Sequence, residues 1–311
     1  MTTFTAADVP DLTGRTAIVT GANSGVGLAT TRALAAAGAH VVLAVRDVGK
    51  GRAAAEHLPG TTEVRALDLA DLASVRDFAA HWEGPVDLLV NNAAAPPPSE
   101  LRHTADGFEL QFGTGHLGHF ALTTLLLEHL TGRVVTVASQ AERFARLDLA
   151  GLDALEAMNR GPRPGDPATA TPYRSSRVYG QVKLANLLFT AELQRRLTAA
   201  GSDVRAHAAH PGYVDTAIYR ENGPVSRVMV RLLAQSPEQG ALPVLFAAVA
   251  DLPGNSFTGP RHLAHMRGSA EPIPRSAAAQ DAELARRLWT MSERLTGVAW
   301  PAGSARTGSP A

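Results

Sequence analysis

Short apolar runs alternate with segments of helical periodicity through the first two thirds of the chain. The runs expected to form buried strands lie at 16–20, 40–45, 63–67, 86–90, 133–138 and 204–209. Helical patterns cover 26–37, 49–58, 72–82, about 106–130 and 176–199. Runs of Val, Ile and Leu between helices are typical of a parallel sheet covered on both faces. The pattern therefore predicts an α/β fold, a doubly wound parallel sheet of the Rossmann type, with ligands at the carboxyl ends of its strands.

Two stretches interrupt this alternation. Residues 140–175 are rich in Gly and Pro, and residues 260–282 are similarly irregular. Neither resembles a domain linker, because patterned segments resume after each. We therefore expect a single domain over 1–298, with a nucleotide-binding half at about 12–138 and a catalytic and substrate-binding half at about 139–298. The remainder, 299–311, has the Gly, Ser, Ala and Pro composition of a disordered tail.

Composition narrows the classes of function. The 311 residues are 45% apolar, enough for a continuous core. Lys plus Arg equals Asp plus Glu, at 29 each, so no net field attracts nucleic acid or an anionic membrane. The absence of cysteine excludes disulfides and thiolate chemistry. With no signal peptide and no apolar run of membrane-spanning length, we expect a cytoplasmic protein without a nucleic-acid or membrane partner.

A glycine-rich turn joins the first strand to the first helix. Glycines in Thr20–Gly27 are spaced Gly-x-x-x-Gly-x-Gly, and they let the backbone approach a pyrophosphate at a helix N-terminus. A purely structural turn is the alternative. The expected cofactor contacts of this turn are Gly21, Asn23, Ser24, Gly25, Val26 and Gly27.

The end of the second strand bears on cofactor choice. Val45 occupies the tip where an acidic residue would bind a free ribose hydroxyl, and Arg46 follows it. A guanidinium pairs well with a 2′-phosphate, which favours NADP(H) over NAD(H). Alternatively, Asp47 simply neutralises Arg46 on the surface.

Polar and small residues follow the next three strands. Asp68 and Leu69 close the third strand, where the carboxylate either meets the adenine amino group or caps the next helix. Small residues after the fourth strand leave space for a cofactor, and asparagine amides there can tie strand ends together; the predicted contacts are Asn92, Ala93 and Ala94. Ser139 ends the fifth strand, where its hydroxyl could donate to a substrate carbonyl oxygen or cap a turn.

Tyr179 and Lys183 lie four residues apart in a helical pattern, so their side chains leave the same face. A cation beside a phenol favours the phenolate and lowers the tyrosine pKa. That allows tyrosine to serve as a general acid or base near neutrality. An isolated pair of this kind would more often be an ordinary surface pair, but the other motifs occur in the order that a nicotinamide oxidoreductase needs.

Together these motifs resemble the short-chain dehydrogenase/reductase family, in its retinol-dehydrogenase-like branch of NADP-dependent carbonyl reductases, over about 11–298. The resemblance implies that Tyr179 exchanges a proton with the substrate oxygen and that Ser139 orients it. It implies that Lys183 binds the nicotinamide ribose and depresses the tyrosine pKa, so Tyr179 and Lys183 also contact the cofactor. The family's Pro-Gly turn would add contacts from Pro211, Gly212, Val214 and Thr216.

Three positions depart from the family pattern. Gly115 replaces an asparagine that helps to hold a water linking the catalytic lysine to solvent, so another water or His116 takes over, or proton relay is impaired. Val182 stands where serine is usual, and Ala94 where glycine is usual. His116 and His119 have metal-ligand spacing, but no third ligand is evident, so we expect no metal and interpret them as packing or surface histidines.

These observations predict an NADP(H)-dependent oxidoreductase that interconverts a carbonyl and an alcohol, acting on a small to medium, lipophilic molecule. The alternative is an NADP(H)-binding sensor or scaffold protein with little or no turnover, which Gly115 motivates. The helices at 106–130 and 176–199 are surfaces that relatives use for pairing, so a homo-oligomer is possible.

Overall fold

A computed structural model describes residues 3–159, 173–214 and 235–301. Within them one sheet has the strand order β3-β2-β1-β4-β5-β6-β7-β8. Its strands are β1 (Thr16–Thr20), β2 (His40–Val45), β3 (Thr61–Ala66), β4 (Val86–Asn91), β5 (Leu130–Val137), β6 (Arg205–Ala209), β7 (Phe257–His262) and β8 (Arg267–Pro272). Neighbours pair in parallel up to β7, and β8 is antiparallel. The predicted doubly wound fold is confirmed.

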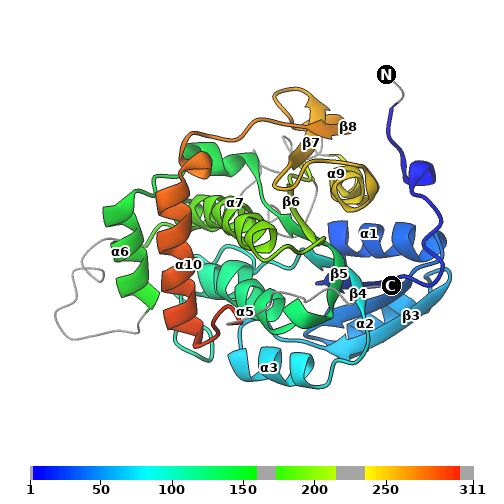
Figure 1. Ribbon diagram of the computed structural model, residues 1–311, viewed down its shortest axis with the longest axis horizontal. Helices are drawn as coiled ribbons and strands as arrows, with labels where there is room; N and C mark the ends of the chain where they lie inside the picture. The colour runs from blue at the N-terminus through cyan, green and yellow to red at the C-terminus, as the bar shows by residue number, and fades with distance from the viewer. Residues whose placement is uncertain (1–2, 160–172, 215–234, 302–311) are drawn as a thin grey trace.

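The sheet separates two hydrophobic cores (Figure 1). One face carries α1 (Gly25–Ala36), α2 (Val48–Ala55) and α9 (Pro237–Val249); the other carries α3 (Leu72–Ala80), α5 (Gly118–Leu125) and α7 (Ser175–Ala199). Successive residues of a strand point to opposite faces. In β1, accordingly, Ile18 joins one core and Val19 the other. This explains why the strands are continuous apolar runs rather than alternating ones.

The chain reverses its direction across the sheet beside β1. From β1 it proceeds to β2 and β3 on one side, and β4 then returns to the other side of β1. Ligands of such sheets bind in the crevice at the carboxyl ends of the two strands that flank this reversal. The candidate site therefore lies where β1 and β4 end.

The helix predicted over 106–130 is wrong in its extent. The structure has α4 (Leu110–Phe112), a π-helical segment η2 (Gly113–Leu117), α5 and a short 3₁₀ helix η3 (Leu127–His129). Glycine lowers helix stability, and here Gly113 and Gly115 lie within the π-helical segment. The residues before Leu110 form a turn in which Gly107 has a φ of 85°.

The two irregular stretches contain ordered elements that we did not predict. Residues 260–282 include β8 and the end of β7, joined by a turn in which Leu263, Ala264 and His265 all have positive φ. Because these residues are not glycines, the sequence gives little sign of that turn. The stretch 140–175 contains η4 (Gln140–Phe144) and α6 (Leu149–Asn159), and its residues 160–172 lie outside the described ranges.

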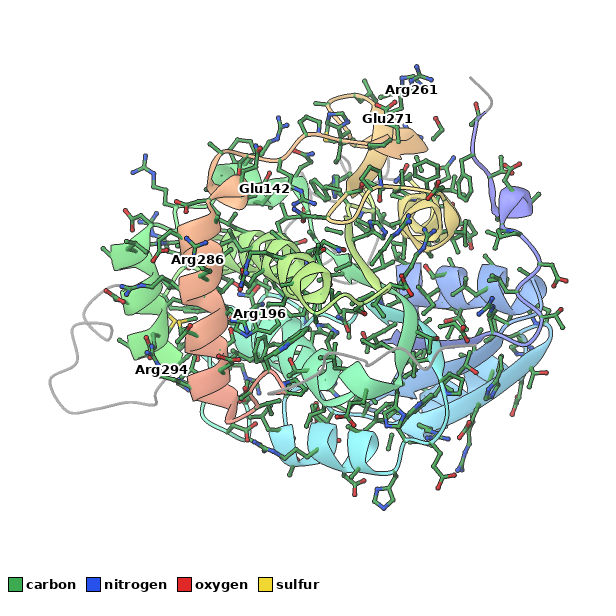
Figure 2. The ribbon with its side chains drawn as sticks, in the orientation of Figure 1. Glu142, Arg196, Arg261, Glu271, Arg286 and Arg294 are labelled. Atoms are coloured by element: carbon green, nitrogen blue, oxygen red, sulfur yellow. The ribbon has the colours of Figure 1, made fainter. Side chains whose placement is uncertain are left out.

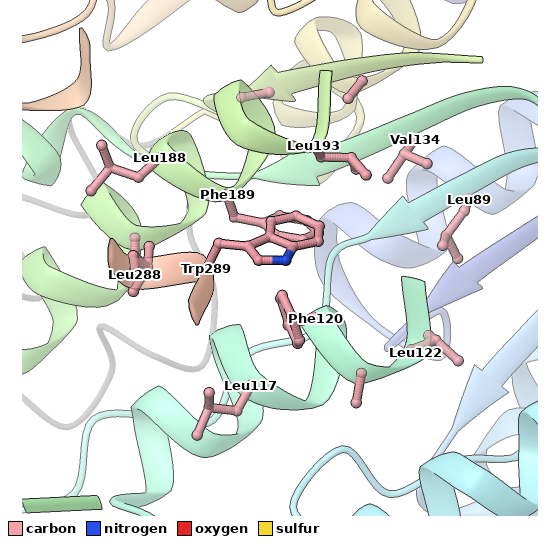
Figure 3. Packing of buried hydrophobic residues seen from close by; sticks show 14 of the residues in the cluster. Leu89, Leu117, Phe120, Leu122, Val134, Leu188, Phe189, Leu193, Leu288 and Trp289 are labelled. Atoms are coloured by element: carbon pink, nitrogen blue, oxygen red, sulfur yellow. The ribbon is translucent and has the colours of Figure 1, made fainter. Parts of the chain in front are cut away.

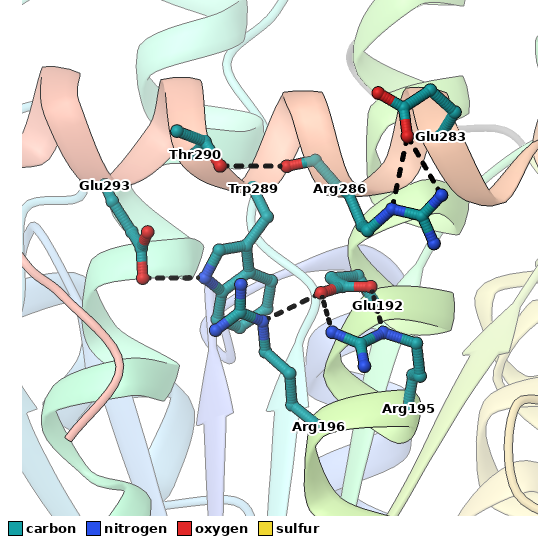
Figure 4. A network of polar contacts seen from close by, with 8 residues as sticks. All are labelled: Glu192, Arg195, Arg196, Glu283, Arg286, Trp289, Thr290 and Glu293. Carbon is teal, nitrogen blue, oxygen red and sulfur yellow. Dashed lines mark hydrogen bonds and ion pairs between the residues drawn. The ribbon is translucent and has the colours of Figure 1, made fainter. Parts of the chain in front are cut away.

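The last helix, α10 (Ala282–Thr296), packs across α5 and α7 (Figure 1). Trp289 stacks on Phe189 of α7, with ring centroids 5.7 Å apart, and meets Phe120 of α5 edge-on at 4.9 Å (Figure 3). The Arg196 guanidinium lies 4.5 Å from the Trp289 ring centroid and also pairs with the buried Glu192 (Figure 4). The helix α10 thus covers part of the surface of α5 and α7 that we expected to be available for contact between subunits.

Ion pairs join separate elements of the fold. Arg294 of α10 contacts Glu156 of α6 at 2.8 Å, and Arg261 contacts Glu271 across the β7–β8 pair at 3.3 Å (Figure 2). Among the described helices, none has both the length and the apolar character needed to cross a bilayer.

Candidate active site

The glycine-rich turn closes tightly against the end of β4. Gly21 and Gly25 have φ of 64° and 54°, which favour glycine. A Cβ on Gly27 would lie 2.5 Å from both Asn92 Nδ2 and Gly21 O, so only glycine fits there. Ser24 is the N-cap of α1, yet its side chain makes no capping hydrogen bond. The first amides of α1 and the Ser24 hydroxyl therefore remain available to a phosphate.

Thr20 ties the ends of β1 and β4 together. Its Oγ1 accepts hydrogen bonds from the backbone N–H groups of Asn92 and Ala93, both at 2.9 Å. Asn92 Nδ2 in turn donates to Thr20 O at 2.8 Å. The expectation that an asparagine amide links neighbouring strand ends is confirmed, whereas we did not predict the part played by Thr20.

His119 of α5 contacts the Thr20 hydroxyl that joins the ends of β1 and β4. Its Nε2 lies 2.9 Å from Thr20 Oγ1, and its Nδ1 lies 3.3 Å from Gly115 O. Because Gly115 O can only accept, Nδ1 carries the ring proton, and Nε2 accepts from the Thr20 hydroxyl, which also lies 3.3 Å from Val90 O. Burial lowers the pKa of His119 to about 4, so the ring is neutral. His119 is a buried positioning residue rather than a surface histidine.

At the end of β2, Arg46 is exposed and Asp47 is the N-cap of α2. Asp47 accepts from the Lys50 N–H at 3.0 Å and contacts Lys50 Nζ at 3.3 Å. Within the described residues its cationic partner is thus Lys50 and not Arg46. The alternative in which Asp47 neutralises Arg46 is therefore wrong.

The two roles weighed for Asp68 can be partly separated. Asp71, not Asp68, caps α3, by accepting from the Ala73 N–H at 2.9 Å. Asp68 instead accepts from the Ala70 N–H at 2.9 Å within the turn that follows β3. The neighbouring Leu69 is buried in the core. The helix-cap alternative for Asp68 is wrong, and contact with adenine stays a prediction.

Lys183 reaches the end of β5 from α7, and Tyr179 lies one helical turn before it. Lys183 is only 5% exposed, and its Nζ donates to Val137 O at 3.1 Å. Asn186 Nδ2 donates to the same carbonyl at 3.1 Å. The Lys183 Nζ lies 5.6 Å from the ring centroid of the half-buried Tyr179. Burial lowers the pKa of Lys183 to about 8.

Ser139 lies two residues beyond the carbonyl that holds Lys183. Its Oγ accepts from the Ala141 N–H at 3.2 Å and so caps η4. The capping alternative is therefore correct, but it uses only an acceptor position of the hydroxyl. The hydroxyl proton can still be donated to a substrate oxygen.

The Pro211–Val214 turn is held against the β7–β8 hairpin. Gly212 has a φ of 80°, and a Cβ there would lie 2.5 Å from Met266 O. The Tyr213 N–H donates to Met266 O at 3.0 Å, and Val214 pairs with Gln235 through an isolated bridge. Thr216 lies outside the described residues, so its predicted phosphate contact stays a prediction.

His116 lies away from the predicted cofactor turn, under α10. Its Nε2 is 2.9 Å from Ser292 Oγ, which itself donates to Leu288 O, so His116 is the donor. Burial lowers the pKa of His116 to about 3, opposed by a hydrogen bond with the Asn186 side chain. His116 thus connects α10 to Asn186, which donates to the same carbonyl as Lys183.

Ala94, which stands where the family usually has glycine, has an exposed side chain.

Comparison with known proteins agrees with this geometry. The family model for short chain dehydrogenases matches residues 15–150. The chain is 39% identical to human retinol dehydrogenase 13 over 312 residues, covering 93% of this chain and 86% of the relative. Mouse polyprenol dehydrogenase is 40% identical with the same coverage. The chain therefore belongs to the short chain dehydrogenase family. Its similarity to the retinol dehydrogenases places it in the retinol-dehydrogenase-like branch of that family.

Solved structures support the same placement. An uncharacterized protein from Mycobacterium paratuberculosis has 48% identity and a TM-score of 0.82, covering 97% of this chain and all of that one. An NAD(P)-dependent gluconate 5-dehydrogenase from Beutenbergia cavernae, solved with bound NADP, has 27% identity and a TM-score of 0.55, with coverage of 77% and 91%. The family uses a nicotinamide nucleotide, and the glycine cradle with its available α1 amides fits the pyrophosphate of one.

Proposed function

We propose that this chain is an NADP(H)-dependent oxidoreductase that interconverts a carbonyl and an alcohol. The observation that carries the proposal is the buried Lys183 ammonium, which lies beside the Tyr179 ring and donates to Val137 O at the end of β5, two residues before Ser139. Together Ser139, Tyr179 and Lys183 offer a hydroxyl donor, a phenol and a cation. Those are the groups that proton transfer to a reduced carbonyl requires.

In the reductive direction, the nicotinamide supplies a hydride to the carbonyl carbon when the cofactor is bound. Ser139 donates a hydrogen bond that orients the substrate oxygen. Tyr179 gives its proton to that oxygen, and the Lys183 cation stabilises the phenolate left behind. In the oxidative direction, the Tyr179 phenolate would accept the alcohol proton.

The choice of NADP(H) depends on Arg46. Its side chain is exposed at the end of β2, while the adjacent Asp47 is engaged by Lys50. An exposed guanidinium without a carboxylate partner among the described residues suits a 2′-phosphate. The NADP bound to the Beutenbergia relative supports the same choice.

A lipophilic substrate is supported by the relatives. Two of them are named for retinol and for polyprenol, which are both long apolar alcohols. The sequence also places apolar residues in the stretch after Ser139, among them the exposed Phe144 and Leu149. We further propose that the protein acts in the cytoplasm, as expected from its sequence.

The test is Tyr179→Phe, assayed with NADPH and a panel of aldehydes and ketones that includes apolar ones. We expect turnover to fall by about 100-fold or more, because the general acid is lost, while NADPH binding changes little. Tyr173→Phe is the matched control. It removes the same hydroxyl from another half-buried tyrosine, whose OH is donated to Glu109 at 2.7 Å. Equal turnover in wild type and Tyr179→Phe would refute the assignment.

A sensor or scaffold protein that binds NADP(H) without turnover is the second candidate. The absence of a polar side chain at Gly115 and at Val182 favours it, because Val182 directly precedes Lys183 and lies against the position of Gly115. Calorimetry that detects NADPH binding, combined with no turnover on the substrate panel, would support this alternative. Turnover of any carbonyl that depends on Tyr179 would exclude it.

A further inference from the structure

The position of Ser139 is set by a short 3₁₀ helix, η4, that is weak on its own. Ser139 has extended backbone angles, φ −160° and ψ 154°, and its carbonyl accepts from the Glu142 N–H at 3.1 Å. The i→i+3 bonds of a 3₁₀ helix have poor geometry, so a five-residue helix depends on external contacts. Whatever holds η4 therefore also holds the Ser139 hydroxyl.

One external contact is the surface of α7 next to Tyr179. Gly180 follows the tyrosine directly, and a Cβ there would lie 3.3 Å from Ala141 O and 3.5 Å from Ala145 Cβ. The absence of a side chain at Gly180 thus lets η4 approach the helix that carries Tyr179. Just beyond η4, Gln181 Nε2 of α7 donates to Arg146 O at 3.2 Å, so the chain is also tied to α7 where η4 ends.

The other contact is a buried carboxylate. The Glu142 side chain is 0% exposed and lies where η4 meets the segment leading to α10 (Figure 2). It accepts from the Ser276 N–H at 3.1 Å and from the Ser276 hydroxyl. Ser276 Oγ in turn accepts from the Ala279 N–H at 3.2 Å, so its proton is committed to Glu142. Both oxygens of the carboxylate are used.

Neighbouring residues strengthen this connection. Arg275 is bonded to Asn255, and burial lowers its pKa to about 10 against the opposing attraction of Glu142. Arg143, next to Glu142, donates to Pro274 O at 3.5 Å. A buried carboxylate is costly unless it is hydrogen-bonded and has a cation nearby, and this one has both.

We propose that Glu142 is a positioning residue, which fixes the Ser139 hydroxyl relative to Tyr179 by clamping η4 to Ser276. This inference rests on the proposed use of Ser139 and Tyr179 in carbonyl chemistry. Glu142 itself touches neither substrate nor cofactor. The segment between β8 and α10, distant in sequence from every predicted site residue, thereby takes part in the geometry of the site.

The experiment compares Glu142→Gln and Ser276→Ala with wild type, measuring kcat and KM for an apolar aldehyde with NADPH. We expect kcat to fall on the order of 10-fold to 100-fold in each, because small displacements of a positioned group are costly. NADPH affinity is expected to stay within about twofold, since binding does not depend on η4. Ser276→Thr retains the hydroxyl and should restore most of the loss.

Glu192→Gln is the matched control. Glu192 is also a buried carboxylate on hydrogen bonds, to Arg195 and Arg196, but it lies 13 residues along α7 from Tyr179, about 20 Å away. It should lower thermal stability without lowering kcat. If Glu142→Gln and Ser276→Ala also left kcat unchanged, the positioning role would be overturned.

A double variant separates this inference from the proposed function. If Glu142 acts through Ser139, adding Glu142→Gln to Ser139→Ala should lower kcat no further, whereas a general loss of stability would be additive. Additive losses would overturn the inference while leaving Ser139 in place. Unchanged turnover in Ser139→Ala alone would instead refute the catalytic use of Ser139, and with it the basis of the inference.

Discussion

Val182 occupies the space that a side chain at Gly115 would need. A Cβ built on Gly115 would lie 2.9 Å from Val182 Cγ1, which is closer than real Cβ atoms approach. The two positions that depart from the family pattern are therefore in contact, one in the π-helical segment η2 and the other in α7. An apolar contact has taken the place of polar side chains beside Lys183.

We predict that Gly115→Asn destabilises the protein by about 1–3 kcal/mol, because the added side chain overpacks against Val182. In the Val182→Ser background the added cost should be smaller by about 1 kcal/mol or more, since the crowding methyl groups are gone. Urea unfolding of the four proteins of this cycle measures the coupling. Strictly additive free energies would show that the two positions are independent.

Gly118→Ala serves as the control for that cycle. Its added Cβ would clash with the backbone carbonyl of Leu69 rather than with Val182. Its cost should therefore be the same whether residue 182 is Val or Ser.

Arg46→Ala should weaken NADPH binding by about 10-fold to 100-fold, because a charge-assisted hydrogen bond to the 2′-phosphate is lost. NADH binding should change by less than about threefold, since NADH has no 2′-phosphate. Arg52→Ala removes an exposed cation of α2 as the control and should alter the affinity for neither cofactor. Titration of cofactor fluorescence measures all three, and parallel losses for both cofactors in Arg46→Ala would contradict the role of the arginine.

Buried histidines should make the protein sensitive to acid. The pKa of His119 is about 4 in the folded protein, because of burial, and about 6.5 in an unfolded chain. Between these values the unfolded state binds the extra proton, so stability is fully present above pH 6.5 and is lost as the pH falls toward 4. His119 should therefore lower the free energy of unfolding by about 2 kcal/mol when the pH falls from 7 to 5.

The measurement is the free energy of unfolding in urea at pH 7 and at pH 5. In His119→Gln the difference between the two pH values should shrink by that amount, because the titrating group is gone. The exposed His57 provides the control, since His57→Gln should leave the difference unchanged. An unchanged difference in His119→Gln would show that His119 is not held neutral by burial.

Trp289→Ala should cost about 3–5 kcal/mol, because the ring fills the space between Phe120, Phe189 and the Arg196 guanidinium. Trp300→Ala should cost less, since that ring is only partly buried at the edge of the same cluster. Chemical denaturation of the two variants compares them. Similar losses in both would indicate that α10 is held by contacts other than Trp289.

The sequence predicted most strands, the glycine-rich turn and the Tyr179–Lys183 pair, because each depends on local periodicity or on spacing along one helix. It predicted the hairpin β7–β8 and the segments of 106–130 poorly. The hairpin turn uses three non-glycine residues with positive φ, and the π-helical segment is stabilised by tertiary packing rather than by propensity.

By itself, therefore, the chain determined its fold class and the order of its site residues, since burial on both faces of a sheet imposes a pattern that can be read in one dimension. Only the tertiary structure decided which groups meet across that order: Thr20 with His119, Val182 with Gly115, and Glu142 with Ser276. These contacts join residues between 67 and 134 positions apart. Their partners are selected by packing in three dimensions, which no local pattern records.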